Sequence, residues 1–122
     1  LSQTFLYLSL ERYTMSKLES QFQRELIKKI LDRFPGAFVL KNDPEHVSGI
    51  PDLTVFYRRY WCWLEVKRSK DEPKQPNQDF YIGYANDWAL GAFVHPDNVE
   101  EVLDVMERAF QADWGTCLSQ PE

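Results

Sequence analysis

Apolar residues recur at three- and four-residue spacing near the start of the chain and again near its end. In residues 16–34 the recurring apolar positions are Leu18, Phe22, Leu26, Ile27, Ile30, Leu31 and Phe34. In residues 99–110 they are Val99, Val102, Leu103, Met106, Ala109 and Phe110. This period places each set on one face of a helix, so both segments are predicted to be amphipathic helices. Pro35 and Gly36 end the first helix, and Asp97 with Glu100 has the spacing of a capping box before the second.

Four short runs of β-prone residues lie between these helices. They occupy residues 37–41, 52–57, 60–67 and 91–95. A further helix is predicted between the third and fourth runs, at residues 77–87, with Phe80, Tyr81 and Tyr84 as its apolar positions. The resulting order α-β-β-β-α-β-α predicts an α/β fold in which helices flank a mixed sheet.

The length of the chain, 122 residues, is enough for one domain with a buried core. We expect this domain to span residues 16–112, with an N-terminal extension at 1–15 and a C-terminal tail at 113–122. No apolar stretch approaches the roughly 20 residues that cross a bilayer, so no contact with a membrane is expected. Cys62 and Cys117 have the spacing of neither a zinc site nor a disulfide framework, which favours a cytoplasmic location.

The net charge of −5 argues mildly against a polyanionic partner, but the charge is unevenly distributed. Residues 1–76 contain 13 Lys and Arg against 10 Asp and Glu, whereas residues 77–122 contain 1 against 9. A nucleic acid would therefore contact the first part of the chain, through the basic stretch at 67–74 and the first helix. The alternative is that both parts are ordinary solvated surface.

The segment GIPDLTVFYRRYWCWLEVK, residues 49–67, places charged residues inside two apolar strands. If Arg58 and Arg59 form the turn, the strands pair antiparallel and Asp52 lies opposite Glu65. Facing side chains in such a pair are about 5 Å apart, and like charges at this separation destabilise a sheet. The sequence therefore predicts that another group compensates the two carboxylates.

Side chains alternate between the two faces of the second of these strands. Lys67 lies on the same face as Glu65. The opposite face, which is expected in the core, carries Cys62, Leu64 and Val66. Trp61 and Trp63 share the face of Glu65, where packing in the core or in a dimer is expected ahead of stacking on nucleotides.

Two carboxylates and a lysine in this arrangement suit a phosphodiesterase site that uses a divalent cation. Mg²⁺ and Mn²⁺ prefer hard oxygen ligands, and such a cation would cancel the repulsion between Asp52 and Glu65. The Val66 carbonyl is a further expected ligand. Lys67 is expected to orient the attacking water or to stabilise charge on the phosphate. The alternative is structural, with Asp52 as an ordinary residue before a strand and the other two charges as an exposed ion pair.

Pro51-Asp52, followed after the hairpin by Glu65-Val66-Lys67, resembles the motif of the PD-(D/E)xK nuclease superfamily. The wider pattern of GIPDL, LEVK and QPNQ resembles VRR-NUC-type and Holliday-junction-resolvase-like nucleases, including small phage-encoded ones. The resemblance implies a restriction-endonuclease-like fold and a Mg²⁺-dependent DNA endonuclease, with branched or junction DNA as a candidate substrate. A phage-encoded enzyme of this kind would act in the host cytoplasm.

The same resemblance adds two groups to the expected site. Related nucleases have a glutamate on the first helix that completes the metal site, which implies this role for Glu19, or for Glu25 in its place. Ser16 and Glu19 also have the spacing of a capping box, which is the alternative. The family's glutamine after the lysine strand corresponds to Gln78, or to Gln75, with an implied role in orienting phosphate or water. QPNQ is also a plausible helix start.

Further contacts with DNA are expected from polar and basic residues near this site. They are Lys41, Arg68, Lys70, Lys74 and Gln75. The first hypothesis is therefore a metal-dependent endodeoxyribonuclease, and a homodimer is expected because a chain of this size offers limited surface for gripping DNA. The second hypothesis is a non-catalytic, nuclease-like module that binds DNA structures or another protein.

Overall fold

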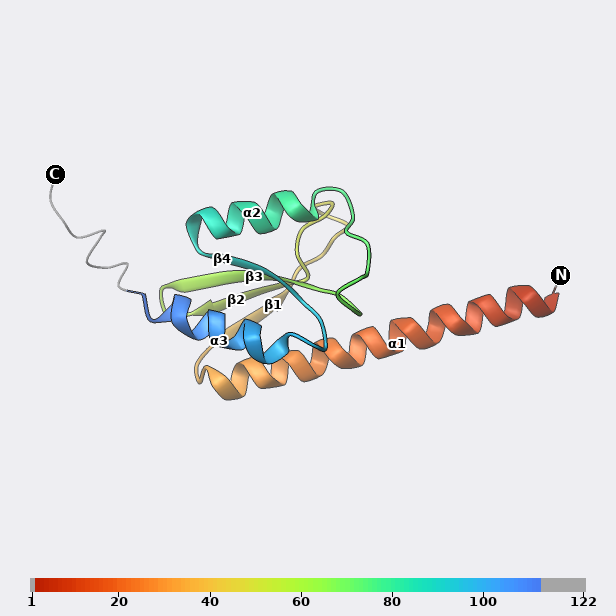
Figure 1. Ribbon diagram of the computed structural model, residues 1–122, viewed down its shortest axis with the longest axis horizontal. Helices are drawn as coiled ribbons and strands as arrows, with labels where there is room; N and C mark the ends of the chain where they lie inside the picture. Colours follow the sequence, from red (N-terminus) through yellow and green to blue (C-terminus); the bar gives the residue numbers. More distant parts are fainter. Residues whose placement is uncertain (1, 113–122) are drawn as a thin grey trace, which may run out of the picture.

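The structure, a computed structural model, describes residues 2–112, which form three helices and a four-stranded sheet (Figure 1). In chain order the elements are α1 (Ser2–Arg33), β1 (Phe38–Lys41), β2 (Leu53–Tyr57), β3 (Tyr60–Val66), α2 (Gln78–Trp88), β4 (Leu90–Val94) and α3 (Val99–Phe110). This order confirms the predicted α/β arrangement. None of these helices is both long and apolar enough to cross a membrane.

The first helix is longer than its apolar pattern predicts. It begins at Ser2 instead of at residue 16, and its first half extends away from the sheet (Figure 1). Because α1 is continuous through residues 15 and 16, the division of the chain into an extension and a domain stays a prediction. The expected tail, residues 113–122, lies outside the described residues, and Cys117 lies there with it.

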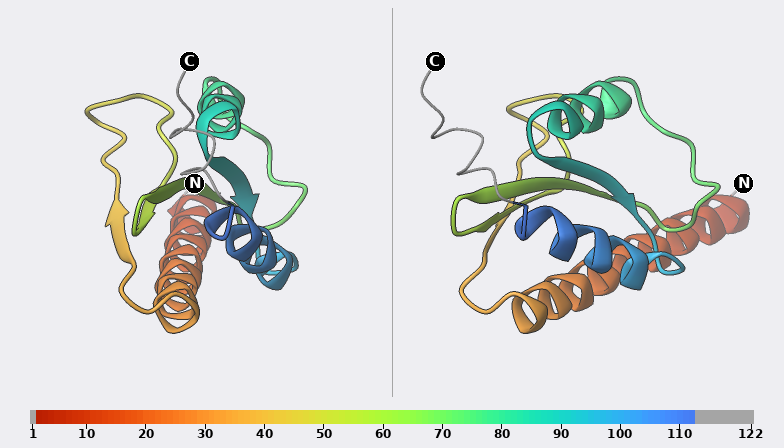
Figure 2. Two further views of the ribbon diagram at one scale, coloured as in Figure 1. Left: turned by 90° about the vertical axis from the view of Figure 1, so that its left-hand side faces the viewer. Right: turned by 60° about the vertical axis from the view of Figure 1, so that its left-hand side comes forward.

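The sheet has the strand order β1-β2-β3-β4, and β4 runs parallel to β3 while the other neighbours are antiparallel. Helices α1 and α3 cover one face, and α2 covers the opposite face over β3 and β4 (Figure 2). The residues of β3 that enter the core are those predicted, Cys62, Leu64 and Val66. The core therefore lies between the sheet and the α1–α3 layer.

Helix α1 enters the core through a narrow stripe. Leu26, Ile30 and Phe34, four residues apart, are buried. Leu18 and Leu31 are 59% and 43% exposed, so their predicted place on the buried face is wrong. The helix meets its neighbours mainly along this i, i+4, i+8 row, with Phe22 and Ile27 partly buried beside it, and the contact is narrower than the face that its apolar pattern indicates.

Helix α2 meets the sheet through small side chains. Ile82 and Ala85 are buried, whereas Phe80 and Tyr84 are 67% and 48% exposed, so the predicted apolar face is wrong for these two rings. Tyr81, the third predicted position, is half-buried and packs edge-on against Trp63 of β3. A Cβ added at Gly91 of β4 would lie 2.6 Å from the carbonyl oxygen of Ile82. The helix backbone therefore rests directly on β4 at Gly91, and no space remains at this point of contact for a side chain.

The capping box predicted before α3 is also wrong. The N-cap is Asn98, whose side chain makes no capping hydrogen bond. Its Oδ1 instead accepts a hydrogen bond from the His95 N–H at 2.8 Å, and its Nδ2 donates to the Phe93 carbonyl at 3.0 Å. Glu100 lies 3.5 Å from Lys29 of α1. Asn98 thus connects the end of β4 to the start of α3.

The hairpin of β2 and β3 turns at the predicted residues, and Tyr57 pairs with Tyr60 in the predicted register. Arg58 has a φ of +58°, which a residue other than glycine adopts at a cost. The guanidinium groups of Arg58 and Arg59 lie 5.0 Å and 5.7 Å from the ring centroids of Tyr57 and Tyr60. These cation–π contacts stabilise a turn whose residue types alone do not favour it.

The loop between β1 and β2 touches the segment before α2 at Gly49. This glycine has a φ of +84°, and a Cβ added to it would lie 2.7 Å from the Cβ of Asn77. Asn77, directly before α2, also has a left-handed backbone, with a φ of 76°. The contact brings the GIPDL and QPNQ segments together, so it positions the parts of the chain that carry Asp52 and Gln78.

We expect Gly49→Ala to lower the free energy of unfolding by about 3 kcal/mol, because it adds a steric overlap to the strain of a positive φ. Gly36→Ala is the matched control, since Gly36 has a φ of +92° and open space around the position of a Cβ. That variant should lose only about 1 kcal/mol. Urea unfolding of both variants measures the difference, and equal losses would contradict the close approach at Gly49.

Candidate active site

The two carboxylates of the hairpin lie side by side at its open end. Asp52 directly precedes β2, and Glu65 is near the end of β3. The Asp52 N–H donates to Glu65 Oε1 at 3.2 Å, and the Val66 N–H donates to Asp52 Oδ2 at 2.8 Å. The backbone thus holds each carboxylate against the neighbouring strand, in the juxtaposition that the strand register predicts.

This juxtaposition changes the acid–base behaviour of both groups. Burial and the nearby charge of Asp52 raise the pKa of Glu65 to about 8. Burial also raises the pKa of Asp52 above its usual value, despite the hydrogen bond from Val66. The environment therefore favours the protonated form of Glu65, and a bound cation would compete with that proton.

Lys67 and Gln78 complete a buried network around Glu65. Lys67, directly after β3, is 4% exposed and donates from Nζ to Gln78 Oε1 at 2.6 Å and to the Pro73 carbonyl at 3.3 Å. The Nε2 of Gln78 donates to Glu65 Oε2, and the Nζ of Lys67 lies 3.9 Å from that same oxygen. The amide of Gln78 therefore connects the lysine to the carboxylate.

Of the two glutamines, Gln78 enters the site and Gln75 does not. Gln78 is the first residue of α2, and its side chain is buried. Gln75 is exposed and contributes its backbone N–H, which donates to Gln78 Oε1 at 2.8 Å. QPNQ is also a helix start, as the alternative interpretation has it, and the role of Gln78 in orienting phosphate or water stays a prediction.

Glu19 on α1 lies close enough to the site for the charges there to shift its pKa. Partial burial raises the pKa of Glu19, and the charges of Glu72 and Asp52 raise it further. Because α1 is continuous through Ser16, there is no helix N-terminus for a capping box at that residue. Glu25, the expected substitute, is exposed and accepts a hydrogen bond from Gln21 Nε2 at 3.2 Å.

Glu72 belongs to this site, although nothing in the sequence indicates it. Its Oε2 lies 3.6 Å from Lys67 Nζ, and its Oε1 accepts a hydrogen bond from Arg68 Nε at 2.6 Å. Burial acts to raise the pKa of Glu72, but the hydrogen bonds from Arg68 outweigh it and lower the pKa. The residue lies in a polar loop without periodicity, so only the folded loop reveals its partners.

Asn42 is a second residue whose role the sequence leaves open. Its backbone N–H donates to the Asp52 carbonyl at 2.9 Å, and its Nδ2 donates to the Pro51 carbonyl at 2.9 Å. The same Nδ2 donates to Thr54 Oγ1 at 2.8 Å, and this hydroxyl also accepts from Trp63 Nε1 at 2.9 Å. Asn42 thereby positions the segment that carries Asp52, and Trp63 has an intramolecular role.

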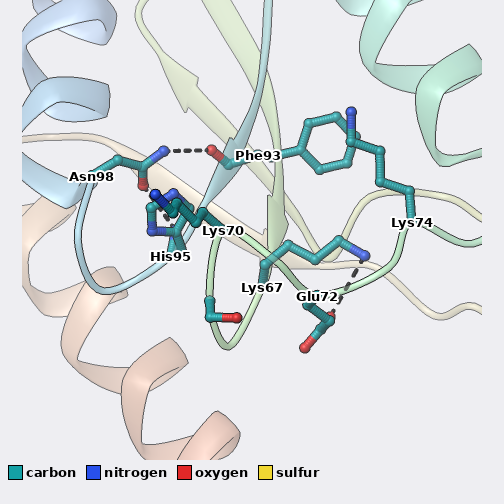
Figure 3. A pocket seen from close by; sticks show the side chains of 8 residues that line it. Lys67, Lys70, Glu72, Lys74, Phe93, His95 and Asn98 are labelled. Atoms are coloured by element: carbon teal, nitrogen blue, oxygen red, sulfur yellow. Dashed lines mark hydrogen bonds and ion pairs between the residues drawn. The ribbon is translucent and has the colours of Figure 1, made fainter.

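The residues expected to contact DNA are distributed around one end of the sheet. Lys41 is exposed at the end of β1, opposite Leu53 at the start of β2. Lys70 and Lys74 line a cavity of about 170 Å³ next to Lys67 (Figure 3). Lys74 also lies 3.2 Å from Asp79 and 4.5 Å from the ring centroid of Phe93.

Within residues 2–112, no three side chains of His, Cys, Asp or Glu are grouped closely enough to hold a metal ion by themselves. The chemistry of the carboxylate pair nevertheless fits Mg²⁺. This ion is usually held by one or two protein carboxylates, with water and substrate phosphate in its other positions. Asp52, which is half-buried, and Glu65, which is buried, provide that pair, and their environment raises the pKa of both. The roles of Glu19 and the Val66 carbonyl as ligands stay predictions.

The arrangement of strands and helices is similar to that of a solved structure described as a "VRR_NUC domain". The two share 24% sequence identity with a TM-score of 0.58, over 70% of this chain and 94% of that chain. The chain has a VRR-NUC-like fold. This similarity confirms the restriction-endonuclease-like fold implied by the motif. No family model matches the sequence, and no curated protein does.

The raised pKa of Glu65 predicts how stability depends on pH when divalent cations are absent. A carboxyl group with a folded pKa of about 8 and an ordinary value of 4.5 stabilises the protein while it is protonated. This contribution is complete below the ordinary value and is lost as the pH rises through the folded value. We expect the melting temperature in EDTA to fall by roughly 5 °C between about pH 5 and pH 8.5.

Glu65→Gln should flatten this pH dependence, because the amide does not titrate. Glu101→Gln, at an exposed position on α3, is the control and should leave the slope unchanged. Thermal unfolding of the three proteins in EDTA provides the measurement. A slope that Glu65→Gln leaves intact would show that other groups cause it.

Proposed function

We propose that the protein is a Mg²⁺-dependent endonuclease that hydrolyses phosphodiester bonds in DNA, with Mn²⁺ as an alternative cofactor. The observation that carries this proposal is the buried network in which Gln78 connects Lys67 to Glu65 beside Asp52. An exposed structural ion pair needs neither the burial nor the bridging amide. The VRR-NUC-like fold supports the same interpretation. In this chain the motif residues lie together at one end of the sheet.

In the proposed reaction Asp52 and Glu65 hold the metal ion, with Glu19 nearby on α1. When bound, the ion supplies an acidified water and stabilises negative charge on the scissile phosphate. Glu65 must release its proton for this to occur, and the ammonium group of Lys67 favours the ionised carboxylate. Lys67, held by Gln78 and the Pro73 carbonyl, is positioned to orient the attacking water or to stabilise charge on the phosphate.

The proposed DNA path passes over the loop after β3. Lys70 and Lys74 line the cavity beside Lys67, and Lys41 extends the exposed positive charge from the end of β1. α3 is acidic, so a polyanion is expected to stay on the opposite side of the sheet end. Branched or junction DNA is the proposed substrate class, and the cytoplasm, of a host where the gene is phage-encoded, is the proposed location.

With Mg²⁺ present, we expect cleavage of one or more substrates among linear duplex, flap, single-stranded and four-way DNA. Asp52→Asn and Lys67→Ala should each lower the cleavage rate by at least about 100-fold, because the first removes a proposed metal ligand and the second removes the group proposed to act on the water or the phosphate. Arg108→Ala removes a cation from the acidic α3 and serves as the control. Unchanged rates in Lys67→Ala would contradict the proposed mechanism.

A thermal-shift measurement separates this proposal from the non-catalytic alternative. Mg²⁺ should raise the melting temperature of the wild type at about pH 8, since the ion binds the folded carboxylate pair and not the unfolded chain. Asp52→Asn should lose that increase. If Mg²⁺ has no effect on either protein and no DNA is cut, the chain is a binding module with a nuclease-like fold.

A homodimer belongs to the same proposal, and the open face of β1 and β2 supports it. Phe38, Leu40 and Phe56 are 61%, 45% and 43% exposed on neighbouring strands, and the Phe38 and Phe56 ring centroids lie 6.3 Å apart. β1 is an edge strand of the sheet. A second copy packed on this face would cover an apolar patch that is costly to leave in water.

In light scattering at about 50 µM, the wild type should have the mass of two chains, and the double variant Phe38→Ser and Phe56→Ser the mass of one. The matched control is Phe80→Ser, which changes an exposed ring on α2. A monomeric wild type would exclude this interface at that concentration.

A further inference from the structure

Glu72 is an acidic residue inside the most basic loop of the protein, and the cations of that loop bind it. Its Oε1 accepts hydrogen bonds from the Arg68 backbone N–H at 3.1 Å and from Arg68 Nε at 2.6 Å. Its Oε2 lies 3.6 Å from Lys67 Nζ. Two cationic side chains and one backbone N–H therefore converge on a single carboxylate.

The same donors have the composition of a phosphate-binding site. Proteins bind nucleic-acid phosphates with arginine, lysine and backbone N–H groups, and charge-assisted hydrogen bonds of this kind are the strong ones. A carboxylate and a phosphodiester both present anionic oxygens to such donors. The side chain of Glu72 is only 18% exposed, so it occupies the space that a phosphate oxygen would need.

The position of Glu72 is next to the proposed reaction centre. Figure 3 shows its carboxylate beside the ammonium group of Lys67, at the edge of the cavity that Lys70 and Lys74 also line. Among the described residues that line this cavity, Glu72 carries the negative charge. Lys67 is shared between Glu72 on one side and Glu65 with Gln78 on the other.

We propose that Glu72 is an internal occupant of a phosphate subsite formed by Arg68 and Lys67, and that a phosphate of the nucleic-acid substrate displaces it. This inference rests on the proposed function, because it assigns the subsite to a phosphate of the substrate at Lys67, beside the proposed reaction centre. Substrate binding is then an exchange of one anion for another. The exchange costs affinity for any polyanion, and it leaves Lys67 paired when no substrate is bound.

The first test measures affinity for a labelled four-way DNA in EDTA at low salt, where cleavage cannot occur. Glu72→Gln removes the competing charge at nearly constant shape and should tighten binding by about tenfold. Asp71→Asn is the matched control, because it removes the same charge from the neighbouring exposed position of the loop. The control should tighten binding by no more than about twofold, through the net charge alone.

Two further variants test the assignment of the donors. Glu72→Ala should tighten binding as Glu72→Gln does, because both variants remove the same carboxylate. A difference between the two would reveal an effect specific to one substitution. In the double variant Arg68→Ala and Glu72→Gln the gain should disappear, since the donor that would receive the phosphate is gone. Equal effects of Glu72→Gln and Asp71→Asn, or weaker binding in Glu72→Gln, would overturn the proposal.

A second readout uses inorganic phosphate as the probe and does not depend on DNA. Phosphate should raise the melting temperature of Glu72→Gln more than that of the wild type or of Asp71→Asn. If the wild type cuts DNA and Glu72→Gln tightens neither ligand, this inference fails and the proposed function stands. If Glu72→Gln gains phosphate binding and no variant cuts DNA, the subsite stands and the proposed function fails.

Discussion

A buried and a half-buried carboxylate, held against each other by backbone hydrogen bonds, are the constraint on which the rest of this structure depends. The strand register pairs Leu53 with Leu64, and it therefore places Asp52 opposite Glu65 at the open end of the hairpin. In a sheet such a pair is unfavourable, and burial together with the nearby charge of Asp52 raises the pKa of Glu65. A protein that only needed a stable hairpin would gain from replacing either residue.

The elements around Asp52 and Glu65 hold the two carboxylates in position. The β1–β2 loop reaches the start of α2 at Gly49, and α2 in turn places Gln78 between Lys67 and Glu65. Asn42 secures the segment before β2 from the other side. Each of these contacts joins parts of the chain that are distant in sequence, so the geometry of the site depends on the packing of the whole sheet end.

Lys67 contacts both the buried carboxylate of Glu65 and the carboxylate of Glu72 at the surface cavity. The ammonium group lies between Glu65 on its buried side and Glu72 on the side of the cavity, while Arg68 holds Glu72 from the loop. Lysine and arginine side chains near a phosphodiesterase centre are usually regarded only as ligands for the substrate. Here their own loop supplies an anion for them, so these cations stabilise the loop, and in the proposed subsite they would exchange that anion for a phosphate.

The sequence by itself determined the order of the elements and the hairpin register, because both follow from short-range periodicity and from a turn that fixes which residues face each other. It also indicated Asp52, Glu65, Lys67 and Gln78. The exposed rings of Phe80 and Tyr84, the place of Glu72 beside Lys67 and the supporting role of Asn42 were decided only by the tertiary structure. These features depend on how closely α2 rests on Gly91 and how two aperiodic loops fold, and such long-range contacts leave no periodic trace in the chain.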